Sequence, residues 1–283
     1  MLETAPEYLV IGHITKDLTP EGTFRVGGTA TYAALTADCL GLSVGVITST
    51  ESSLSLFQQA PSITVRTRPA ERTTTFENIY LNGGRRQHIR ELAETLTVAD
   101  LPSSWRSASI VHLGPVAQEV DYGLAQAFSC SLLGVTPQGW LRSWNAEGLV
   151  SPAEWKQPDL ILDIADVIIL SLEDVGGDWE RLSGYARRSR LLVVTLGKDG
   201  AVVWSEGKMT HVPAYRVVEV DSTGAGDVFA AAYLDRFFET RDALEAARFA
   251  NCVASFSVER VGAVALPARQ QMEQRLLCGD LRD

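Results

Sequence analysis

The residues best suited to chemistry form the stretch Asp221-Ser222-Thr223-Gly224-Ala225-Gly226-Asp227, between the apolar run Val217 to Val220 and a run of small residues. This order predicts a strand, a tight turn and a helix that packs closely against a sheet. At such a helix start the backbone N–H groups of Gly224, Ala225 and Gly226 lack intrahelical acceptors and lie at the positive end of the helix dipole. The turn is therefore a candidate anion site, because glycine lets phosphoryl oxygens approach the backbone.

Asp227 distinguishes this turn from a simple anion site. A carboxylate next to a bound phosphate repels it, so Asp227 does not serve phosphate binding alone. It does suit a general base that takes the proton from a hydroxyl attacking phosphorus. Taken by itself, the segment also fits a purely structural turn in which Asp221 and Asp227 cap the helix.

Several other functional motifs do not fit the chain. A dinucleotide-binding G-x-G-x-x-G would need glycine at Phe229, and a Walker A loop would need Ser or Thr where Asp199 and Met209 follow Gly-Lys. The protein-kinase triplets H-R-D and D-F-G do not occur, nor does H-E-x-x-H. Cysteines and histidines are scattered without C-x-x-C or H-x-x-x-H spacing, which argues against a zinc site or a disulfide framework.

The elements that must position this turn can be predicted from apolar patterning. Short β-branched runs predict strands at 8–11, 44–48, 110–113, 132–136, 167–170 and 191–195. Helical spacing predicts helices at 32–40, 122–128, 179–188, 242–258 and 267–277. Strands that are apolar on both faces and alternate with helices indicate an α/β fold with a mostly parallel sheet. Without repeats or long linkers, residues 1–283 are expected to form one domain.

One stretch breaks this rhythm. Thr73 to Tyr80 alternates polar and apolar residues and is followed by the turn Asn82-Gly83-Gly84 and by Arg86 to Ile89. This pattern predicts a hairpin with one solvent-exposed face. Such a hairpin is a candidate lid over a site, and an additional edge hairpin is the alternative.

Composition limits the kinds of partner. The chain has 283 residues, of which 46% are hydrophobic, so it has enough apolar surface for a core. Its net charge of −10 disfavours nucleic acid and anionic membranes as partners. The first residues lack the basic segment of a signal peptide, no apolar run approaches the roughly 18 residues of a membrane span, and the scattered cysteines fit a reducing compartment. We therefore expect a cytoplasmic protein.

The turn also resembles a family signature. Asp221 to Asp227 resembles the D-T-x-G-A-G-D motif of the ribokinase-like (PfkB) carbohydrate kinases. Further matches follow the family order, namely Gly12 and Asp17 at a first strand end, Gly27-Gly28 before a helix, Thr195 to Gly200 as T-x-G-x-x-G, and Asn251 with Gly262. The resemblance covers residues 8 to about 267 and implies a three-layer α/β sandwich with a central mostly parallel sheet. It also implies a small β lid, formed here by about 15–26 and 66–92.

The resemblance implies transfer of a phosphoryl group from ATP, with Mg²⁺, to a hydroxyl of a small sugar or cyclic polyol. Asp227 would be the general base, and the backbone of Gly224, Ala225, Gly226 and Asp227 would form the anion hole. The implied nucleotide contacts are Thr195, Gly197, Gly200, Thr223, Asn251 and Gly262. The implied substrate contacts are Asp17, Gly27, Gly28, Tyr32, Gln138 and Arg142, and the implied metal contacts are Asp174 and Asp221.

Two positions depart from the family pattern. Ser171 stands where the family has the Asn of an N-x-x-E element, and Tyr32 replaces an Asn that family sugar kinases use on the substrate. The lid strand and the segment Pro137 to Arg142 resemble the branch that includes inositol kinases. The alternatives are a nucleoside kinase on the same scaffold and a non-catalytic nucleotide- or sugar-sensing protein. The lid is also a candidate homodimer surface, whereas His13 and His112 are expected to be structural.

Overall fold

The structure is a computed structural model that describes residues 4–52, 54, 57, 60–81, 84–262 and 266–282. Its main feature is a nine-stranded sheet in the order β15-β14-β13-β12-β9-β8-β1-β4-β5. The strands are β1 (Tyr8–Ile11), β4 (Val44–Thr50), β5 (Thr64–Pro69), β8 (Ile110–Leu113), β9 (Leu132–Val135), β12 (Val167–Ser171), β13 (Leu191–Thr195), β14 (Ala201–Ser205) and β15 (Lys208–Val212). All neighbours from β5 to β13 pair in parallel, whereas β14 and β15 are antiparallel. The predicted α/β class is confirmed.

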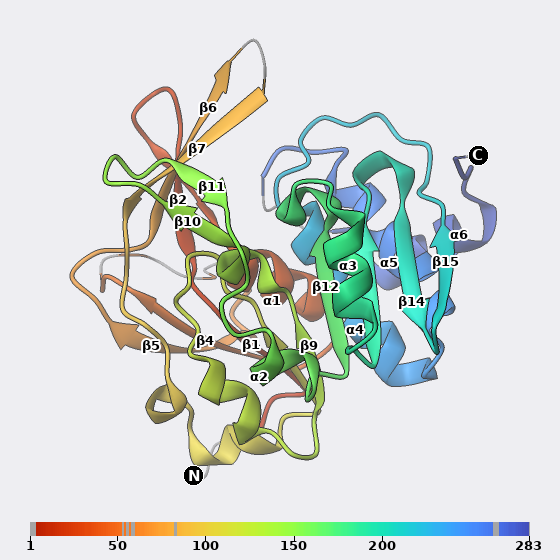
Figure 1. The fold of residues 1–283 in the computed structure, drawn as a ribbon, viewed down its shortest axis with the longest axis horizontal. Helices are drawn as coiled ribbons and strands as arrows, with labels where there is room; N and C mark the ends of the chain where they lie inside the picture. Colours follow the sequence, from red (N-terminus) through yellow and green to blue (C-terminus); the bar gives the residue numbers. More distant parts are fainter. Residues whose placement is uncertain are drawn as a thin grey trace.

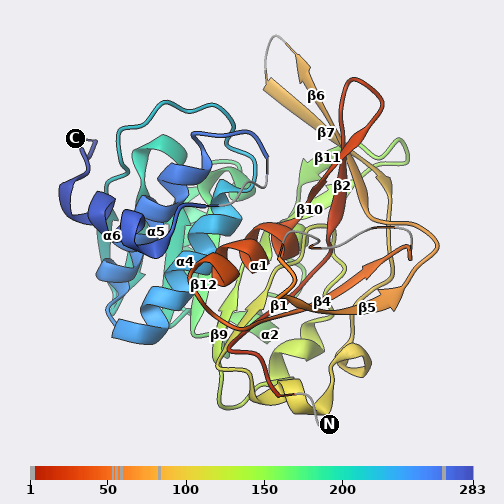
Figure 2. The same ribbon diagram turned by 180° about the vertical axis from the view of Figure 1, so that it is seen from behind.

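Helices cover both faces of this sheet, because successive strand residues point to opposite sides. In β1, Tyr8 and Val10 pack into one core cluster, and Leu9 and Ile11 pack into another. One face carries α1 (Thr29–Cys39), α4 (Ala225–Thr240), α5 (Ala243–Ser257) and α6 (Arg269–Cys278) (Figure 2). The other carries α2 (Asp159–Leu162) and α3 (Trp179–Ala186) (Figure 1). The short 3-10 helices are η1 (Val98–Asp100), η2 (Ser103–Ser107), η3 (Tyr122–Ala127), η4 (Pro137–Leu141), η5 (Leu172–Val175) and η6 (Gly197–Asp199).

A second, smaller sheet projects from one end of the molecule (Figure 1). It has the order β3-β2-β6-β7, with β3 (Phe24–Gly27), β2 (Thr15–Leu18), β6 (Thr75–Leu81) and β7 (Gly84–Glu91). The pair β10 (Arg142–Trp144) and β11 (Val150–Pro152) lies beside it, and His88 bridges to Leu149. The range 66–92 predicted for this sheet begins too early, since residues 66–69 pair with β4 in the large sheet. The predicted turn residues Asn82 and Gly83 lie outside the described residues.

Two predicted elements differ from the structure. The run Val217 to Val220 is not a strand, and Val218 and Val220 are 80% and 57% exposed. Instead of pairing with β15, it is held by the N–H groups of Val220 and Asp221, which donate to the Val258 carbonyl after α5. The segment 122–128 forms the 3-10 helix η3, which is capped by the side chain of Asp121, rather than an α-helix.

The strand order places a site at one edge of the large sheet. The chain leaves β1 for β4 and β5 on one side and later builds β8, β9 and β12 on the other. The place where the strand order changes direction in this way is called the switch point. Ligands of open α/β sheets bind there, outside the carboxyl ends of the strands. Here those ends are Gly12 after β1 and Gly114 after β8, and a β-carbon on Gly12 would overlap the Gly114 carbonyl. Among the helices of the described residues, none combines the length and hydrophobicity needed to cross a membrane.

Candidate active site

Asp227 lies in the first turn of α4, and α1 orients it. Thr29, the first residue of α1, donates a hydrogen bond of 2.7 Å from its hydroxyl to Asp227 Oδ1. Burial raises the pKa of Asp227 to about 6, opposed by the Thr29 hydrogen bond and Arg142 and reinforced by the negative charges of Asp174 and Asp17. These groups come from four different elements, so the fold brings the predicted base, two predicted substrate contacts and a predicted metal contact into one electrostatic environment.

The Gly27-Gly28 pair allows α1 to start close to Asp17. Gly28 has φ +88°, and a β-carbon there would overlap the carbonyl oxygen of His13. A β-carbon on Gly27 would overlap the Asp17 carboxylate, which therefore lies directly against the backbone of Gly27. The three predicted substrate residues Asp17, Gly27 and Gly28 are thus neighbours, and two of them must lack side chains for the third to fit.

Tyr32 packs against the candidate anion-binding turn at 221–227, called the anion turn below. Gly224 has φ +77°, and a β-carbon on it would overlap the aromatic ring of Tyr32. Burial raises the pKa of Tyr32, and the nearby carboxylates of Asp17 and Asp227 raise it further. Tyr32 was expected at the substrate. The structure packs its ring against Gly224, and its contact with the substrate remains a prediction.

The turn offers fewer unpaired donors than the sequence predicts. The Ala225 N–H donates to the Ser222 carbonyl over 3.2 Å, and the Asp227 N–H donates to the Gly224 carbonyl over 3.0 Å. Within the described residues, the N–H groups of Gly224 and Gly226 have no such acceptor. A β-carbon on Gly226 would meet no atom within 4 Å, so open space adjoins this residue. The anion-binding part of the turn is therefore centred on the two glycines.

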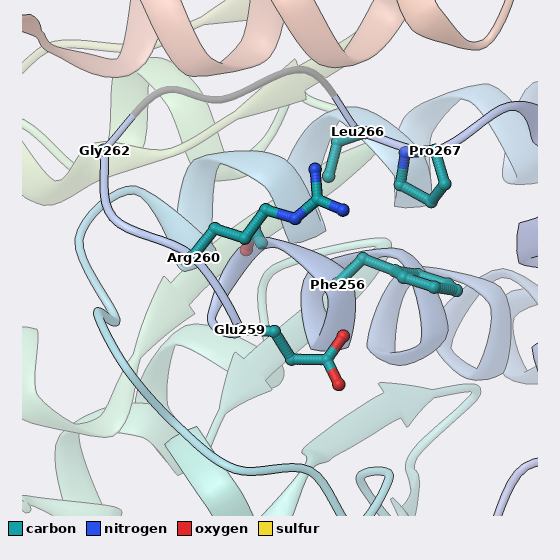
Figure 3. A pocket seen from close by; sticks show the side chains of 7 residues that line it. Phe256, Glu259, Arg260, Gly262, Leu266 and Pro267 are labelled. Atoms are coloured by element: carbon teal, nitrogen blue, oxygen red, sulfur yellow. The ribbon is translucent and has the colours of Figure 1, made fainter.

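Asp221 ties the turn to the loop after α5. Its Oδ1 accepts the Thr223 N–H at 2.9 Å, and its Oδ2 accepts the Gly262 N–H at 3.1 Å. Partial burial opposes its ionisation, but these hydrogen bonds and nearby Arg25 lower the pKa of Asp221. Gly262 also lines a small pocket, in which the Arg260 side chain reaches toward Leu266 (Figure 3). Thr223 and Gly262, the two predicted nucleotide contacts in this region, are thus linked through the Asp221 carboxylate.

Asp174 belongs to a capping box. Ser171 Oγ accepts the Glu173 N–H at 3.1 Å, and Asp174 Oδ2 accepts the Ser171 N–H at 2.8 Å. Asp174 Oδ1 also accepts a hydrogen bond of 3.3 Å from the Gln138 amide. Both oxygens of Asp174, like both of Asp221, are therefore already hydrogen bonded to the protein. The described residues contain no cluster of three His, Cys, Asp or Glu side chains that could hold a metal ion. The two predicted metal contacts do not fit a direct protein ligand set.

The nucleotide-side residues divide into two groups. Thr195 ends β13 beside Ser171 of β12, and the glycines at 197 and 200 adopt φ +59° and +92° in the turn that follows. Asn251, in contrast, is buried, and its amide donates to the carbonyls of Val212 and Pro213 over 3.1 Å each. The expectation that Asn251 lines the nucleotide directly is replaced by a tethering role, in which it holds the end of β15.

Gln138 and Arg142 reach the site from η4 and β10. Gln138 contacts Asp174 as described, and Arg142 donates a hydrogen bond of 3.4 Å to the Val116 carbonyl while its charge lowers the pKa of Asp227. The two predicted substrate contacts are therefore each associated with an acidic residue of the site, Gln138 with Asp174 and Arg142 with Asp227. The motif G-x-S-x-G occurs at Gly41 to Gly45, but Ser43 bonds Glu7 at the amino end of β4, so it is not a nucleophile of this site.

Comparisons with known proteins agree with this geometry. The model of the pfkB family carbohydrate kinases matches residues 180–269, which include the anion turn and Asp227. A fructokinase of Escherichia coli is 29% identical over 204 residues, covering 63% of this chain and 64% of that relative, so the match spans less than two thirds of its length. The ribokinase of Arabidopsis thaliana complexed with ribose and ATP superposes with a TM-score of 0.73 at 21% identity, covering 96% of this chain and 99% of that one. Residues 180–269 therefore match the pfkB family of carbohydrate kinases, and the chain as a whole has the ribokinase fold.

The fold of this chain is shared with a further group of kinases. A pyrophosphate-dependent kinase of the ribokinase family, complexed with a pyrophosphate analogue and myo-inositol, superposes with a TM-score of 0.79 at 22% identity. The match covers 94% of this chain and 99% of that one. The expected three-layer fold is thereby confirmed, and the two superpositions show that it accommodates kinases described with different phosphoryl donors.

The structure also identifies residues that the sequence did not single out. Thr29 holds Asp227, and buried Glu119 accepts backbone N–H groups from His13, Val116 and Ala117 at 2.7 to 3.0 Å. Glu119 thereby fixes both loops at the switch point.

His13 is buried and hydrogen bonded to Thr74 and to the Glu94 carbonyl, which confirms its predicted structural role.

Replacing Glu119 should destabilise the fold. Glu119→Ala would leave three buried N–H donors without an acceptor, and we expect a loss of at least about 2 kcal/mol in the free energy of unfolding. Urea denaturation at neutral pH measures this loss. The exposed Glu154→Ala should change it by less than about 0.5 kcal/mol. Equal effects of the two substitutions would contradict the anchoring role of Glu119.

Proposed function

We propose that this chain is an ATP-dependent kinase that transfers the γ-phosphoryl group to a hydroxyl of a small sugar or cyclic polyol. The observation that carries the proposal is the carboxylate of Asp227, held by Thr29 at the switch point and adjacent to the open space at Gly226. A pKa of about 6 keeps this carboxylate ionised at neutral pH while making it more basic than an ordinary aspartate.

In the proposed reaction Asp227 accepts the proton of the acceptor hydroxyl as its oxygen attacks the γ-phosphorus. The new O–P bond forms while the bond to the β,γ-bridging oxygen breaks, and ADP leaves with that oxygen. The N–H groups of Gly224 and Gly226 and the dipole of α4 stabilise the charge on the transferring group. Asp17, Gln138 and Arg142 bind the acceptor's other hydroxyls, and the small sheet β3-β2-β6-β7 acts as the lid.

In the proposal, Mg²⁺ is bound to the phosphates of ATP rather than to a site on the protein. Mg²⁺ bound to ATP neutralises phosphate charge and is typically held by phosphates and water with one or two carboxylates. Because Asp174 and Asp221 are already hydrogen bonded through both oxygens, we assign no direct ligand to the protein. Their role in the proposal is to hold η5 and the anion turn in place.

Exposed apolar side chains favour ATP over pyrophosphate as donor. Val218, Val220 and Val261 are exposed by 80%, 57% and 49%, and they flank the turn and the loop that contains Gly262. Apolar surface of this kind suits a purine ring, whereas pyrophosphate would gain nothing from it. A nucleoside kinase would use the same machinery and differ in the acceptor pocket, so the acceptor decides between the two.

An acceptor panel tests the proposal. The chain is incubated with Mg-ATP and, separately, with D-fructose, D-ribose, myo-inositol and adenosine, while ADP is followed. We expect one of the sugars or the inositol to stimulate ADP formation, and replacement of ATP by pyrophosphate to abolish product. Stimulation by adenosine alone would favour the nucleoside kinase. Without stimulation by any member, and without a difference between wild type and Asp227→Asn, the chain would be a sensor.

The pH profile should report the ionisation of Asp227. Protonated Asp227 cannot accept the hydroxyl proton, so kcat/KM should be level above pH about 6 and fall about tenfold per unit below it. Initial rates between pH about 5 and 8 measure the profile, and circular dichroism at each pH checks that the chain stays folded. A level profile across this range would contradict the assignment of Asp227 as the base.

A further inference from the structure

Three buried side chains on adjacent strands form a hydrogen-bonded chain that the proposed function does not use. The Tyr8 hydroxyl of β1 lies 2.8 Å from His112 Nδ1 of β8. His112 Nε2 lies 2.9 Å from Thr136 Oγ1, just after β9. Tyr8 and His112 are fully buried, and Thr136 retains 8% exposure at the carboxyl edge of the sheet. This series of hydrogen bonds therefore runs from the core to the edge of the sheet where the proposed acceptor binds.

The donors and acceptors available on the three side chains fix the direction of these hydrogen bonds. Burial lowers the pKa of His112 to about 3, so its ring is neutral and has one N–H donor and one acceptor nitrogen. Among the described residues the Tyr8 hydroxyl has His112 Nδ1 as its partner. If Nδ1 were the donor, the fully buried Tyr8 O–H would have no acceptor, which is costly. Tyr8 therefore donates to Nδ1, and Nε2–H donates to Thr136 Oγ1.

This direction leaves the hydroxyl hydrogen of Thr136 available. The oxygen of Thr136 is occupied as an acceptor from His112, so the hydroxyl can donate to another group. Thr136 Oγ1 would lie 3.4 Å from a β-carbon on Gly114, and the methyl group of Thr29 lies against the same position. Because Gly114 has no side chain, the Thr29 methyl group can occupy this position, which places the Thr136 hydroxyl close to the residue that holds Asp227.

We propose that Tyr8 and His112 are positioning residues that hold the Thr136 hydroxyl as a hydrogen-bond donor to an oxygen of the acceptor bound at the switch point. The inference rests on the proposed function for the identity of the acceptor, but the direction of the hydrogen bonds does not. Thr136 contacts the acceptor, and its two buried partners prevent its hydrogen from turning back to the imidazole.

Binding measurements test the outer half of this proposal. Acceptor binding is measured by calorimetry without ATP, using D-fructose, D-ribose and myo-inositol as probes. Loss of one hydrogen bond predicts that Thr136→Val and Tyr8→Phe each weaken binding about threefold to tenfold, whereas Thr136→Ser retains it. Tyr8→Phe should have no further effect in the Thr136→Val background, and ATP binding should stay unchanged in all variants.

A matched control separates this role from packing. Tyr233 is another buried tyrosine, and its hydroxyl donates to the Ala243 carbonyl away from the site. Tyr233→Phe should leave acceptor binding unchanged. Additive effects of Tyr8→Phe and Thr136→Val, or equal effects of Tyr8→Phe and Tyr233→Phe, would overturn the proposal.

The histidine tautomer tests the inner half without any substrate. Nitrogen NMR of ¹⁵N-histidine-labelled protein, assigned by comparison with His112→Gln, should show His112 protonated at Nε2 and unprotonated at Nδ1. Protonation at Nδ1 would overturn the proposal whatever the acceptor is. If the wild type binds none of the three probes but has the expected tautomer, the proposed substrate class fails while the hydrogen-bond direction stands.

Discussion

Asp227→Asn is expected to lower kcat by about 10² to 10⁴, the usual contribution of a general base. The substitution keeps the shape of the side chain and an oxygen that can accept the Thr29 hydroxyl, so the loss is chemical rather than structural. Steady-state rates with saturating Mg-ATP and the acceptor identified by the panel measure the effect. The KM for ATP should change little, because a carboxylate beside a phosphate does not contribute to its binding.

The stability of this variant provides an independent check. The folded-state pKa of Asp227 is raised to about 6, so the ionised carboxylate destabilises the folded chain progressively as the pH rises through that value. Asn carries no charge, and we expect Asp227→Asn to be more stable than wild type at pH about 7 by about 1 to 2 kcal/mol. The exposed Asp163→Asn serves as control, because it removes only a surface ion pair with Arg188; it should leave the rate unchanged and the free energy of unfolding within about 1 kcal/mol. An Asp227→Asn variant with wild-type kcat would contradict the proposed mechanism.

Gly224→Ala is expected to disrupt the anion turn. An alanine there must keep φ +77°, and its β-carbon overlaps the Tyr32 ring. Tyr32, the turn or both must therefore move. A displacement of about 1 Å at a reacting centre can cost about 10² in rate, and the strain should lower the free energy of unfolding by about 1 to 3 kcal/mol. The measurements are kcat/KM for ATP and urea denaturation.

Two other glycines separate the causes of this effect. Gly41 also has positive φ, at +96°, but a β-carbon there meets no atom within 4 Å. Gly41→Ala should therefore show the backbone cost alone, with wild-type kcat/KM. Gly226→Ala also meets open space, so the fold should be retained while donor binding is reduced. If Gly224→Ala behaved like Gly41→Ala, contact between Gly224 and Tyr32 would not matter to the site.

Local patterns sufficed to predict the parts of the site that depend on short stretches of chain. Gly224 was predicted because such a turn needs residues without side chains, whereas Gly27 and Gly28 were predicted from the family resemblance. Each of the three has a close neighbour that explains the requirement. The strands of the large sheet were predicted for a similar reason, since a parallel sheet covered on both faces produces continuous apolar runs. Ser171 to Asp174 is an S-x-x-D capping-box pattern, a local signal that was open to interpretation but was assigned to the metal.

The remaining features depend on contacts between distant residues. Thr29 and Asp227 are 198 positions apart, and neither position alone indicates that they share a hydrogen bond. Asn251 was expected to face the nucleotide, but its amide satisfies two carbonyls at the end of β15. The valines at 218 and 220 match a strand by composition, yet no neighbouring strand pairs with them, so tertiary context overrides their β propensity.

A crystal structure of the chain with the acceptor and a non-hydrolysable ATP analogue tests the central claim most directly. The proposed mechanism predicts the attacking hydroxyl within about 3 Å of an Asp227 carboxylate oxygen, in line with the terminal phosphorus, whose oxygens contact Gly224 and Gly226. An acceptor bound away from Asp227, or a terminal phosphate that does not reach the turn, would contradict it.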